Sequence, residues 1–100
     1  MDPDIPSFII ADVVISTAGR DKGRLYYVIA AKDGYVSLVN GKDRSMEKPK
    51  RKKCKHTKMV LRSETRVAEK LRFGEKVLSS EIRKDLAYLS RTMQENDLGG

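Results

Sequence analysis

Short runs of apolar residues, each ended by residues that favour turns, occupy the first sixty positions of the chain. Residues 13–15 form one such run, and residues 25–31 and 35–39 form two longer ones that are rich in β-branched and aromatic side chains. Only residues 32–34 separate the last two runs, and they end in Asp33-Gly34. An Asp-Gly pair between β-rich runs is a strong hairpin signal, because both turn positions tolerate a positive φ. This part of the chain therefore predicts β-strands joined by tight turns.

Two further features extend the β pattern. Asn40-Gly41 predicts a second turn of the same kind, and residues 57–61 predict a further short strand with Met59 and Leu61 on one face. Four or five short strands within about fifty residues favour a small closed barrel, because closure removes the exposed edges of a short open sheet. We therefore expect a mainly β fold, with the barrel formed by residues 8–62.

From Ser63 onward the apolar positions follow the period of a helix. Ser63 is a good N-cap for a first helix that Gly74 ends, and Ser79 or Ser80 is a good N-cap for a second. We expect two short helices within residues 63–95 that cover one side of the barrel.

The second of these helices carries an apolar stripe at positions i, i+4, i+7 and i+11. The stripe consists of Ile82, Leu86, Leu89 and Met93, and the opposite face carries Arg83, Lys84, Asp85 and Arg91. Such a stripe is typical of a helix that packs on a core, and a dimer or partner face is the alternative.

The net charge of +7 at pH 7 is concentrated in the β-rich part of the chain. Residues 1–12 carry three acidic and no basic side chains, residues 13–62 carry fourteen basic and four acidic ones, and residues 63–100 carry seven of each. The middle segment thus has a charge of +10. This excess indicates a polyanionic partner, with nucleic acid first and an acidic membrane or protein surface second.

Length and composition restrict the class of protein. One hundred residues correspond to one domain, which is too small for a long substrate-enclosing cleft, so we expect no small-molecule substrate. A single Cys excludes an internal disulfide and fits a reducing cytosol. No apolar run reaches the ~20 residues that span a bilayer, and the first four residues are acidic where a secretory signal is basic. We expect a cytoplasmic protein.

The densest cluster of charge lies at residues 48–58, where seven of eleven residues are basic and none is acidic. Such density causes self-repulsion unless a polyanion neutralises it, so the segment predicts a loop that binds phosphates most strongly at low salt. A solvated loop or a localisation tract is the alternative. The position of the segment inside the β unit, rather than on a tail, favours phosphate binding.

A second basic segment, residues 18–24, contains two glycines four positions apart that bracket a charged tip. Glycine lets the backbone turn sharply and approach a ligand closely, although an ordinary tight loop shows the same pattern. The segment is not a P-loop, because neither a Gly-Lys-Ser/Thr sequence nor a helix follows it.

The run at residues 12–29 resembles a KOW motif, in which apolar and polar residues alternate around one glycine, here Gly23. Blocks at residues 39–44, 47–52 and 55–56 continue the resemblance in the right order. Over roughly residues 10–60 the chain is similar to bacterial KOW-domain RNA-binding proteins, which are related to the large-subunit ribosomal protein numbered fourteen in the archaeal and eukaryotic series. The C-terminal helices match no motif.

This resemblance implies an SH3-like small β barrel that binds RNA, with structured ribosomal RNA and the ribosome as expected partners. Its motif positions suggest both basic segments as RNA contacts, where Arg bonds phosphate bidentately and Lys acts as a point charge. The expected RNA-binding residues are Gly19, Arg20, Lys22, Gly23, Arg24, Arg44, Lys48, Lys50, Arg51, Lys52, Lys53, Lys55, His56 and Lys58. We expect readout of shape and charge, because the deep major groove of an RNA helix is hard to read.

Other chemistry has weak support in the sequence. Cys54 and His56 are the only residues of their types, and a structural zinc site needs four ligands, so we expect no metal and no cofactor. No third group that could orient Cys54 and His56 is evident, which argues against a nucleophile–base pair, and no paired carboxylates suggest another active site. We therefore expect no enzyme. The surrounding lysines should lower the pKa of the Cys54 thiol.

The tyrosines leave two interpretations open. Tyr26, Tyr27 and Tyr35 could stack on unpaired bases, as aromatic residues of RNA-binding proteins commonly do. Alternatively, one of the adjacent pair Tyr26 and Tyr27 faces the core while the other lies outside.

Function also has an alternative. A KOW-type barrel can dock on proteins such as a polymerase, so a protein-interaction module without direct RNA readout is the second candidate. Such a module need not carry a charge of +10 over fifty residues, which favours RNA. An anionic membrane surface would suit the basic segment, but the sequence shows neither an anchor nor an amphipathic basic helix.

Overall fold

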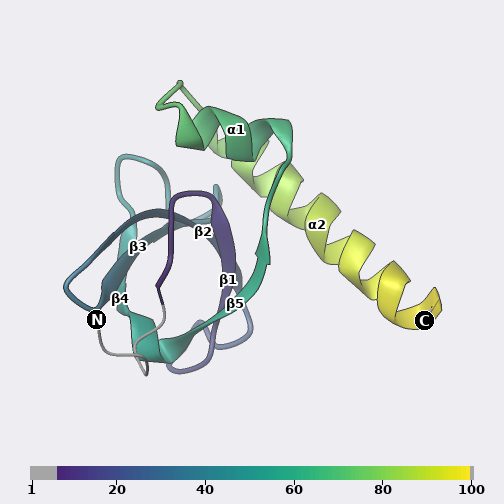
Figure 1. Cartoon of the computed structure of the whole chain (residues 1–100), viewed down its shortest axis with the longest axis horizontal. Coiled ribbons are helices and arrows are strands. Elements are labelled where there is room, and N and C mark those ends of the chain that lie inside the picture. Colours follow the sequence, from purple (N-terminus) through teal and green to yellow (C-terminus); the bar gives the residue numbers. More distant parts are fainter. Residues whose placement is uncertain (1–6, 100) are drawn as a thin grey trace.

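The computed structural model describes residues 7–99, with side chains described as far as Gln94. In this part of the chain, one antiparallel sheet contains β1 (Asp12–Ser16), β2 (Leu25–Lys32), β3 (Tyr35–Val39), β4 (Lys50–Lys53) and β5 (Thr57–Arg62), in the order β4-β3-β2-β1-β5. The short 3-10 helix η1 (Cys54–His56) joins β4 to β5, and the helices α1 (Arg66–Arg72) and α2 (Ser79–Gly99) follow (Figure 1).

The sheet is strongly curled but is not closed. Its two edge strands are β4 and β5, yet only the three residues of η1 connect them. The edges of a flat five-stranded sheet would lie about 19 Å apart, whereas so short a connection reaches about 14 Å. The edges therefore approach each other at η1, as the curl in Figure 1 shows. No backbone ladder joins β4 to β5 within the described residues, so the expected closed barrel is observed only as a curled open sheet.

The strand β1 and the first half of β2 are buried on both faces, which explains why their apolar runs are continuous rather than alternating. Val14 and Tyr26 are register partners that face the inside of the curl, whereas their neighbours Val13 and Tyr27 pair on the outer face. The inner core consists of Phe8, Val14, Tyr26, Val28, Val36, Leu38 and Cys54. The two faces thus support two separate hydrophobic cores.

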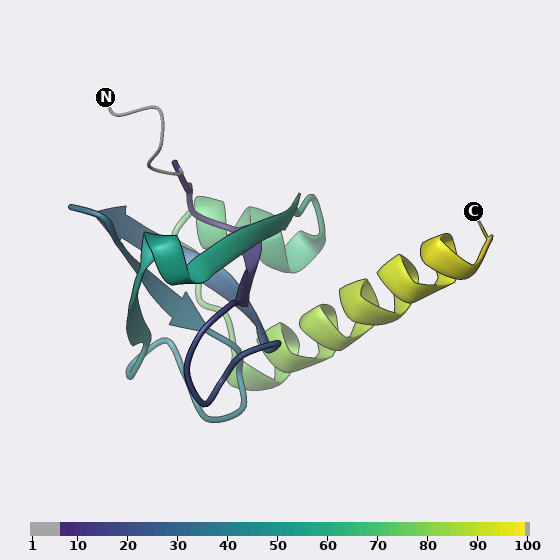
Figure 2. The ribbon, with the colours of Figure 1, turned by 90° about the horizontal axis from the view of Figure 1, so that it is seen from below.

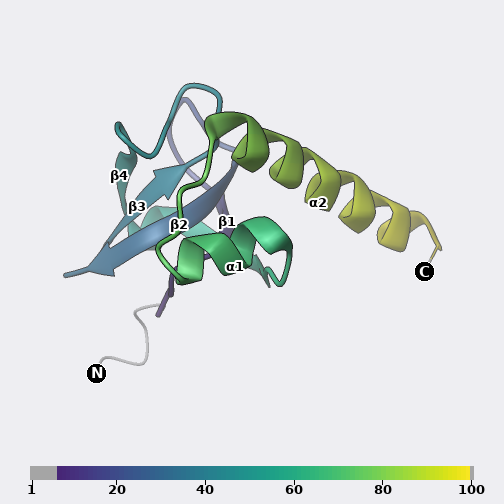
Figure 3. The ribbon, with the colours of Figure 1, turned by 90° about the horizontal axis from the view of Figure 1, so that it is seen from above.

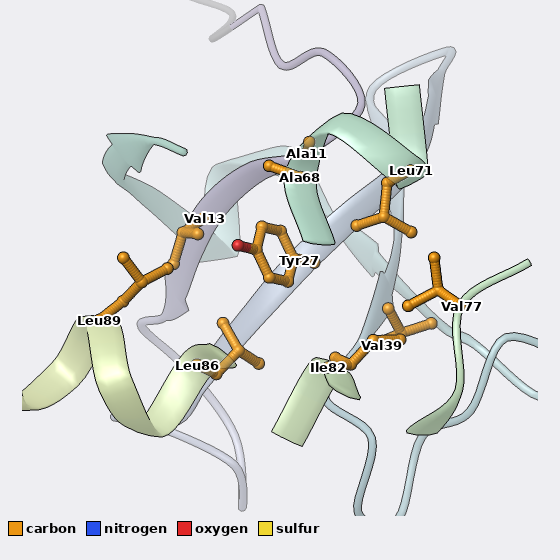
Figure 4. Close-up of a cluster of buried hydrophobic side chains, with 10 residues drawn as sticks. All are labelled: Ala11, Val13, Tyr27, Val39, Ala68, Leu71, Val77, Ile82, Leu86 and Leu89. Carbon is orange, nitrogen blue, oxygen red and sulfur yellow. The ribbon is translucent and has the colours of Figure 1, made fainter. Parts of the chain in front are cut away.

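The outer core lies between the sheet and the two helices. Figure 4 shows Tyr27 at its centre, with Leu86 and Leu89 of α2 on one side and Leu71 of α1 on the other. The cluster consists of Ala11, Val13, Tyr27, Val39, Ala68, Leu71, Val77, Ile82, Leu86 and Leu89. The apolar stripe of the second helix is therefore core, as expected, for three of its four members. The fourth, Met93, is half-buried and lies outside the cluster.

The helix boundaries differ in part from the expectation. Thr65 rather than Ser63 caps α1, because its side chain accepts a hydrogen bond from the backbone nitrogen of Ala68. Gly74, at φ 71°, follows the end of α1 as expected. Ser79 is the first residue of α2 rather than its cap.

The helix α2 is long rather than short, and runs for 21 residues. Both helices lie on one side of the sheet (Figure 3), and the C-terminal half of α2 extends past the sheet (Figure 2). Asp85 does not lie on the solvent-facing side of α2. It accepts hydrogen bonds from the hydroxyls of Tyr27 and Thr65 and so connects α2 to the sheet and to the start of α1.

The turn after β2 is confirmed, and the turn after β3 is not. Asp33 and Gly34 have φ values of 53° and 80° and form the β2–β3 hairpin. Residues 40–49 form a longer loop, because the side-chain oxygen of Asn40 accepts hydrogen bonds from the backbone nitrogens of Lys42 and Arg44 instead of letting the chain reverse at once. Gly41 lets this loop pack closely against the start of α2, because a Cβ there would meet the backbone of Ser79 and Arg83.

A β-bulge changes which face the residues of β5 occupy. Val13 pairs with Leu61 and Val14 pairs with Met59, so the register shifts by one residue at Val60. Met59 therefore packs on the inner core and Leu61 on the outer core. The expectation that both share one face is wrong, because an inserted residue reverses the side-chain alternation beyond it.

Candidate nucleic-acid interface

The two basic segments of the sequence lie side by side in the structure. The backbone nitrogen of Thr17, at the start of the β1–β2 loop, donates to the carbonyl oxygen of His56 in η1 at 2.9 Å. The ammonium group of Lys52 in β4 donates to the carbonyl oxygen of Ala18 in the same loop, also at 2.9 Å. Residues more than thirty positions apart in the chain thus come together where the β1–β2 loop contacts β4 and η1.

The segment at residues 48–58 is not the loop that its charge suggested. Residues 50–53 form β4, the edge strand that pairs with β3. Because side chains alternate along a strand, Lys50 and Lys52 lie opposite the core residues Leu38 and Val36 and point inward. Arg51 and Lys53 point to the outer face.

Asp21 in the β1–β2 loop holds both inward-pointing lysines. One carboxylate oxygen lies 2.9 Å from the ammonium of Lys52, and the other lies 3.0 Å from that of Lys50. The hydroxyls of Ser16 and Tyr26 donate to the same carboxylate at 2.9 and 3.0 Å. Asp21 is therefore a buried anchor that fixes the β1–β2 loop to β4 and β2.

This network decides the charge state of Asp21 and the availability of the two lysines. Burial alone would raise the pKa of Asp21, but the hydrogen bonds from Lys52, Lys50, Ser16 and Tyr26 outweigh burial and hold the pKa well below its usual range. Lys52 is buried and its charge is neutralised inside the protein. The expectation that Lys52 is a phosphate contact is therefore wrong, and Lys50 is engaged by the same carboxylate.

The end of the β1–β2 loop is tied to the β3–β4 loop. The guanidinium of Arg24 lies 3.2 Å from the carboxylate of Asp43, and both side chains are exposed. A hydrogen bond from Asn40 is the main cause that lowers the pKa of Asp43, and Arg24 adds to it. Gly19 and Gly23 have φ values of 85° and 91°, so both positions favour glycine for the shape of the loop.

The remaining cations define what we call the basic surface: Arg20, Lys22, Lys53, Lys55 and Lys58. All five are exposed, and none forms an ion pair with a carboxylate of the described residues. They come from the β1–β2 loop, the end of β4, η1 and the start of β5. His56 is half-buried beside them.

Three further expected RNA contacts lie next to this surface or on the β3–β4 loop. Arg51 is exposed on the outer face of β4, where its guanidinium carbon lies 3.9 Å from the centre of the Tyr35 ring. Lys48 is exposed and Arg44 is half-buried in the β3–β4 loop.

The two-core arrangement corrects both interpretations for Tyr26 and Tyr27 but not the stacking interpretation for Tyr35. Tyr26 and Tyr27 are each at most 1% exposed, one on each face of β2, so neither lies outside and neither can stack on a base. Burial, with help from Asp21 for Tyr26 and from Asp85 for Tyr27, raises the pKa of each hydroxyl to about 12. Of the three tyrosines considered, only Tyr35 remains accessible.

Cys54 is buried, whereas His56 is half-buried beside the basic surface. Cys54 belongs to the inner core, and burial raises the pKa of its thiol, so the expectation that the nearby lysines lower it is wrong. Among the described residues, no three His, Cys, Asp or Glu side chains gather where they could hold a metal ion. No helix in the described part of the chain combines the length and the apolar character needed to cross a membrane.

Asp21 is the site residue that sequence reasoning missed. The sequence shows it as one acid among several bases in a loop, which is also the pattern of a solvated loop tip. Its role follows only when β4 is known to be a strand, because strand alternation is what aims two of the four basic residues inward. Comparison with known proteins adds no assignment: no protein-family model matches the chain, and no significant match to a curated protein is found.

Proposed function

We propose that this protein binds RNA through backbone phosphates, at the basic surface formed by Arg20, Lys22, Lys53, Lys55 and Lys58. In this proposal the curled sheet is a variant of the SH3-like barrel of KOW domains, and structured ribosomal RNA is the expected partner. The observation that carries the proposal is that five exposed cations come from two distant segments that meet where the β1–β2 loop contacts β4 and η1, and none of the five pairs with a carboxylate of the described residues.

The Asp21 network supports a phosphate-binding role for this surface. Loop cations bind a polyanion well when their backbone is already positioned, since less conformational entropy is lost on binding. Asp21 supplies that positioning by tying the β1–β2 loop to β4. Its partners are the inward-pointing Lys50 and Lys52, so the exposed cations stay available for phosphates. The carboxylate is thus buried and neutralised, and it repels a phosphate on the surface only weakly.

The salt dependence of binding tests the proposal. If ~4–6 phosphates are neutralised, with a slope of roughly −0.7 to −0.9 for each, log K against log[salt] should fall with a slope of about −3 to −5. The measurement is a fluorescence-anisotropy titration of a structured ribosomal RNA fragment over a salt series.

A slope shallower than about −1 would contradict the proposal, because phosphate contacts would then be minor. The basic surface would in that case serve solubility or docking on a protein, and the interaction-module alternative would replace RNA binding. Heparin chromatography and the A260/A280 ratio of the purified protein give an early indication of the same distinction.

A further inference from the structure

The outer face of β2, β3 and β4 is divided into two halves. The half with Tyr27 and Val39 lies under the helices in the outer core. The other half continues along the same strands toward the β2–β3 hairpin, and no helix of the described residues covers it, so that Ala30, Lys32 and Arg51 are exposed. There, Lys32 pairs with Tyr35, and Lys53 lies opposite Tyr35 on the next strand. The uncovered half therefore places one aromatic ring between two lysines.

Arg51 completes this arrangement. It lies opposite Ser37 in the ladder and diagonally from Tyr35, and its guanidinium carbon is 3.9 Å from the centre of the Tyr35 ring. That contact is a cation–π interaction, which holds the long Arg51 side chain down on the sheet. The planar guanidinium is thus held in place while the residue remains exposed.

A small hollow lies at the same place. Its volume is about 280 Å³, and its lining residues are Ala30, Lys32, Asp33, Tyr35, Ser37 and Arg51. Drug-sized ligands occupy pockets of about 300–1,000 Å³, so this hollow suits a single flat group rather than a larger folded ligand.

The chemistry of the lining favours a nucleobase over a bare phosphate. A base stacks on an aromatic ring or on a guanidinium plane, and both are present. The carboxylate of Asp33 on the rim would repel a phosphate, whereas it can accept a hydrogen bond from an amino group on the edge of a base. Lys32 and Lys53 stand on either side of the ring, where the phosphates that flank a stacked base can be neutralised.

We propose that the Arg51–Tyr35 pair is a stacking site for one unpaired nucleobase of the RNA held by the basic surface. This inference rests on the proposed RNA binding and adds to it the class of RNA: a strand with at least one unpaired base. Lys53 and Lys55 follow Arg51 along the chain, so phosphates can continue from the stacked base toward η1.

Two probes of equal charge separate stacking from phosphate binding. The first is a single-stranded adenosine decamer, and the second is a fully abasic ribose-phosphate decamer. At a fixed low salt concentration, we expect the wild-type protein to bind the adenosine decamer more tightly by about 5- to 150-fold, which is the range for stacking one base.

The key variant is Arg51→Lys, which keeps the positive charge and removes the planar guanidinium. We expect it to lose most of the preference for the adenosine decamer while its salt slope stays the same. Tyr35→Leu should act likewise, Tyr35→Phe should retain the preference, and Tyr88→Leu is the matched control because Tyr88 is exposed on α2. Arg51→Lys keeps the test valid if Tyr35→Leu fails to fold, because Arg51 is exposed.

The outcomes distinguish this inference from the function on which it rests. Equal affinity of the wild-type protein for both decamers, with a steep salt slope, would overturn the stacking site and leave phosphate binding intact. A preference for adenosine that survives Arg51→Lys would also overturn it. Failure of the wild-type protein to bind either decamer at low salt would overturn the stacking site, whereas a salt slope shallower than about −1 on the structured RNA fragment would overturn phosphate binding as well.

Discussion

Tyr26 and Tyr27 are neighbours on β2, and each is buried with its hydroxyl bonded to a carboxylate, but the two hold together different parts of the molecule. Tyr26 points into the curl of the sheet and donates to Asp21, which connects the β1–β2 loop to β4. Tyr27 points to the outer face and donates to Asp85, which connects the sheet to α2. One pair fixes the basic segments, and the other fixes the helices.

The two carboxylates differ in how their charge is balanced. Asp21 is buried and has two lysine partners, Lys50 and Lys52, that come from the basic segment itself. Asp85 is half-buried and accepts from the hydroxyls of Tyr27 and Thr65, with no ion-pair partner among the described residues. Solvent can therefore compensate part of the charge at Asp85, whereas Asp21 depends on its lysines. The basic segment at residues 48–58 thus has two kinds of lysine: Lys50 and Lys52 pair with a buried carboxylate, and the others are exposed to solvent.

The largest expected loss of stability comes from removing the negative charge of Asp21, the carboxylate that holds the inward-pointing lysines. Asp21→Asn leaves Lys52 buried without its carboxylate, and removing one partner of a buried pair typically destabilises a protein by about 3–5 kcal/mol. Asp43→Asn is the control, because Asp43 pairs with Arg24 at an exposed position. Urea denaturation at pH 7 measures both, and equal losses in the two variants would contradict the anchoring role of Asp21.

Acid titration tests the same anchor by protonating the Asp21 carboxylate. Because the pKa of Asp21 is lowered in the folded state, its stabilising contribution is fully present above the ordinary Asp pKa of about 3.9 and is lost as the pH falls below that value. We expect the stability difference between the wild-type protein and Asp21→Asn to shrink steadily below about pH 4. A difference that stays constant from pH 7 to pH 2 would mean that ionisation of Asp21 is not what matters.

On the outer side, the largest effect is expected from the core itself. Leu86→Ala removes apolar contacts between α2 and the sheet and should destabilise the protein by about 2–5 kcal/mol, while RNA affinity persists where the variant remains folded. Tyr88→Ala, at an exposed position of the same helix, should change stability little. Thermal unfolding and sedimentation measure the result. A stable Leu86→Ala monomer derived from a self-associating wild-type protein would instead identify the stripe as an oligomer face.

Removing the hydroxyl of Tyr26 or Tyr27 should lower stability by a smaller amount. Tyr26→Phe and Tyr27→Phe each remove a buried hydrogen bond to a carboxylate and should cost about 1.5–3 kcal/mol at pH 7. Since the pKa of each tyrosine is raised to about 12, the stability that each contributes is present below about pH 10 and is lost as the pH rises from about 10 to about 12. Alkaline unfolding followed by circular dichroism should therefore be less steep in each Phe variant. The same steepness in wild type and variants would contradict buried, neutral hydroxyls.

The smallest expected effect concerns the loop that Asp21 anchors. Gly23 has a φ of 91°, and a Cβ built on it would meet no atom within 4 Å, so Gly23→Val adds backbone strain without crowding. We expect a loss of about 1–2 kcal/mol. Gly41→Ala is the contrasting case, because its Cβ would lie 2.7 Å from the backbone nitrogen of Arg83 in α2. An unchanged melting temperature for Gly23→Val would show that the loop does not require this conformation.

Local sequence signals predicted the strands and the apolar stripe of α2. The features that these signals did not predict depend on strand register and on contacts between distant residues. The Asp33-Gly34 hairpin and the core role of Leu86 follow from turn chemistry and from periodicity, which a sequence displays directly. The bulge at Val60 and the long loop after Val39 depend on register and on side-chain bonds to the backbone, which periodicity does not reveal.

The candidate site was predictable in location but not in composition. Charge density identified both basic segments, and the structure brings them together. Charge density did not show which cations remain available to bind phosphates. That depends on the alternation of side chains along β4, an edge strand of four basic residues with little β propensity. Alternation along β2 places Tyr26 and Tyr27 on opposite faces, and both are buried because the helices cover the outer face of a sheet whose inner face is already packed.

The central claim is that the exposed cations of the basic surface, and not the basic character of the whole chain, bind RNA. The most direct measurement compares two triple variants of equal charge change, Lys22→Gln/Lys55→Gln/Lys58→Gln on the basic surface and Arg83→Gln/Lys84→Gln/Arg91→Gln on α2, all at exposed positions. In salt-dependent RNA titrations, we predict that the first variant lowers the slope of log K against log[salt] by about 2–3, whereas the second leaves it close to that of the wild-type protein. Equal reductions in the two variants would contradict the account, because binding would then follow net charge alone.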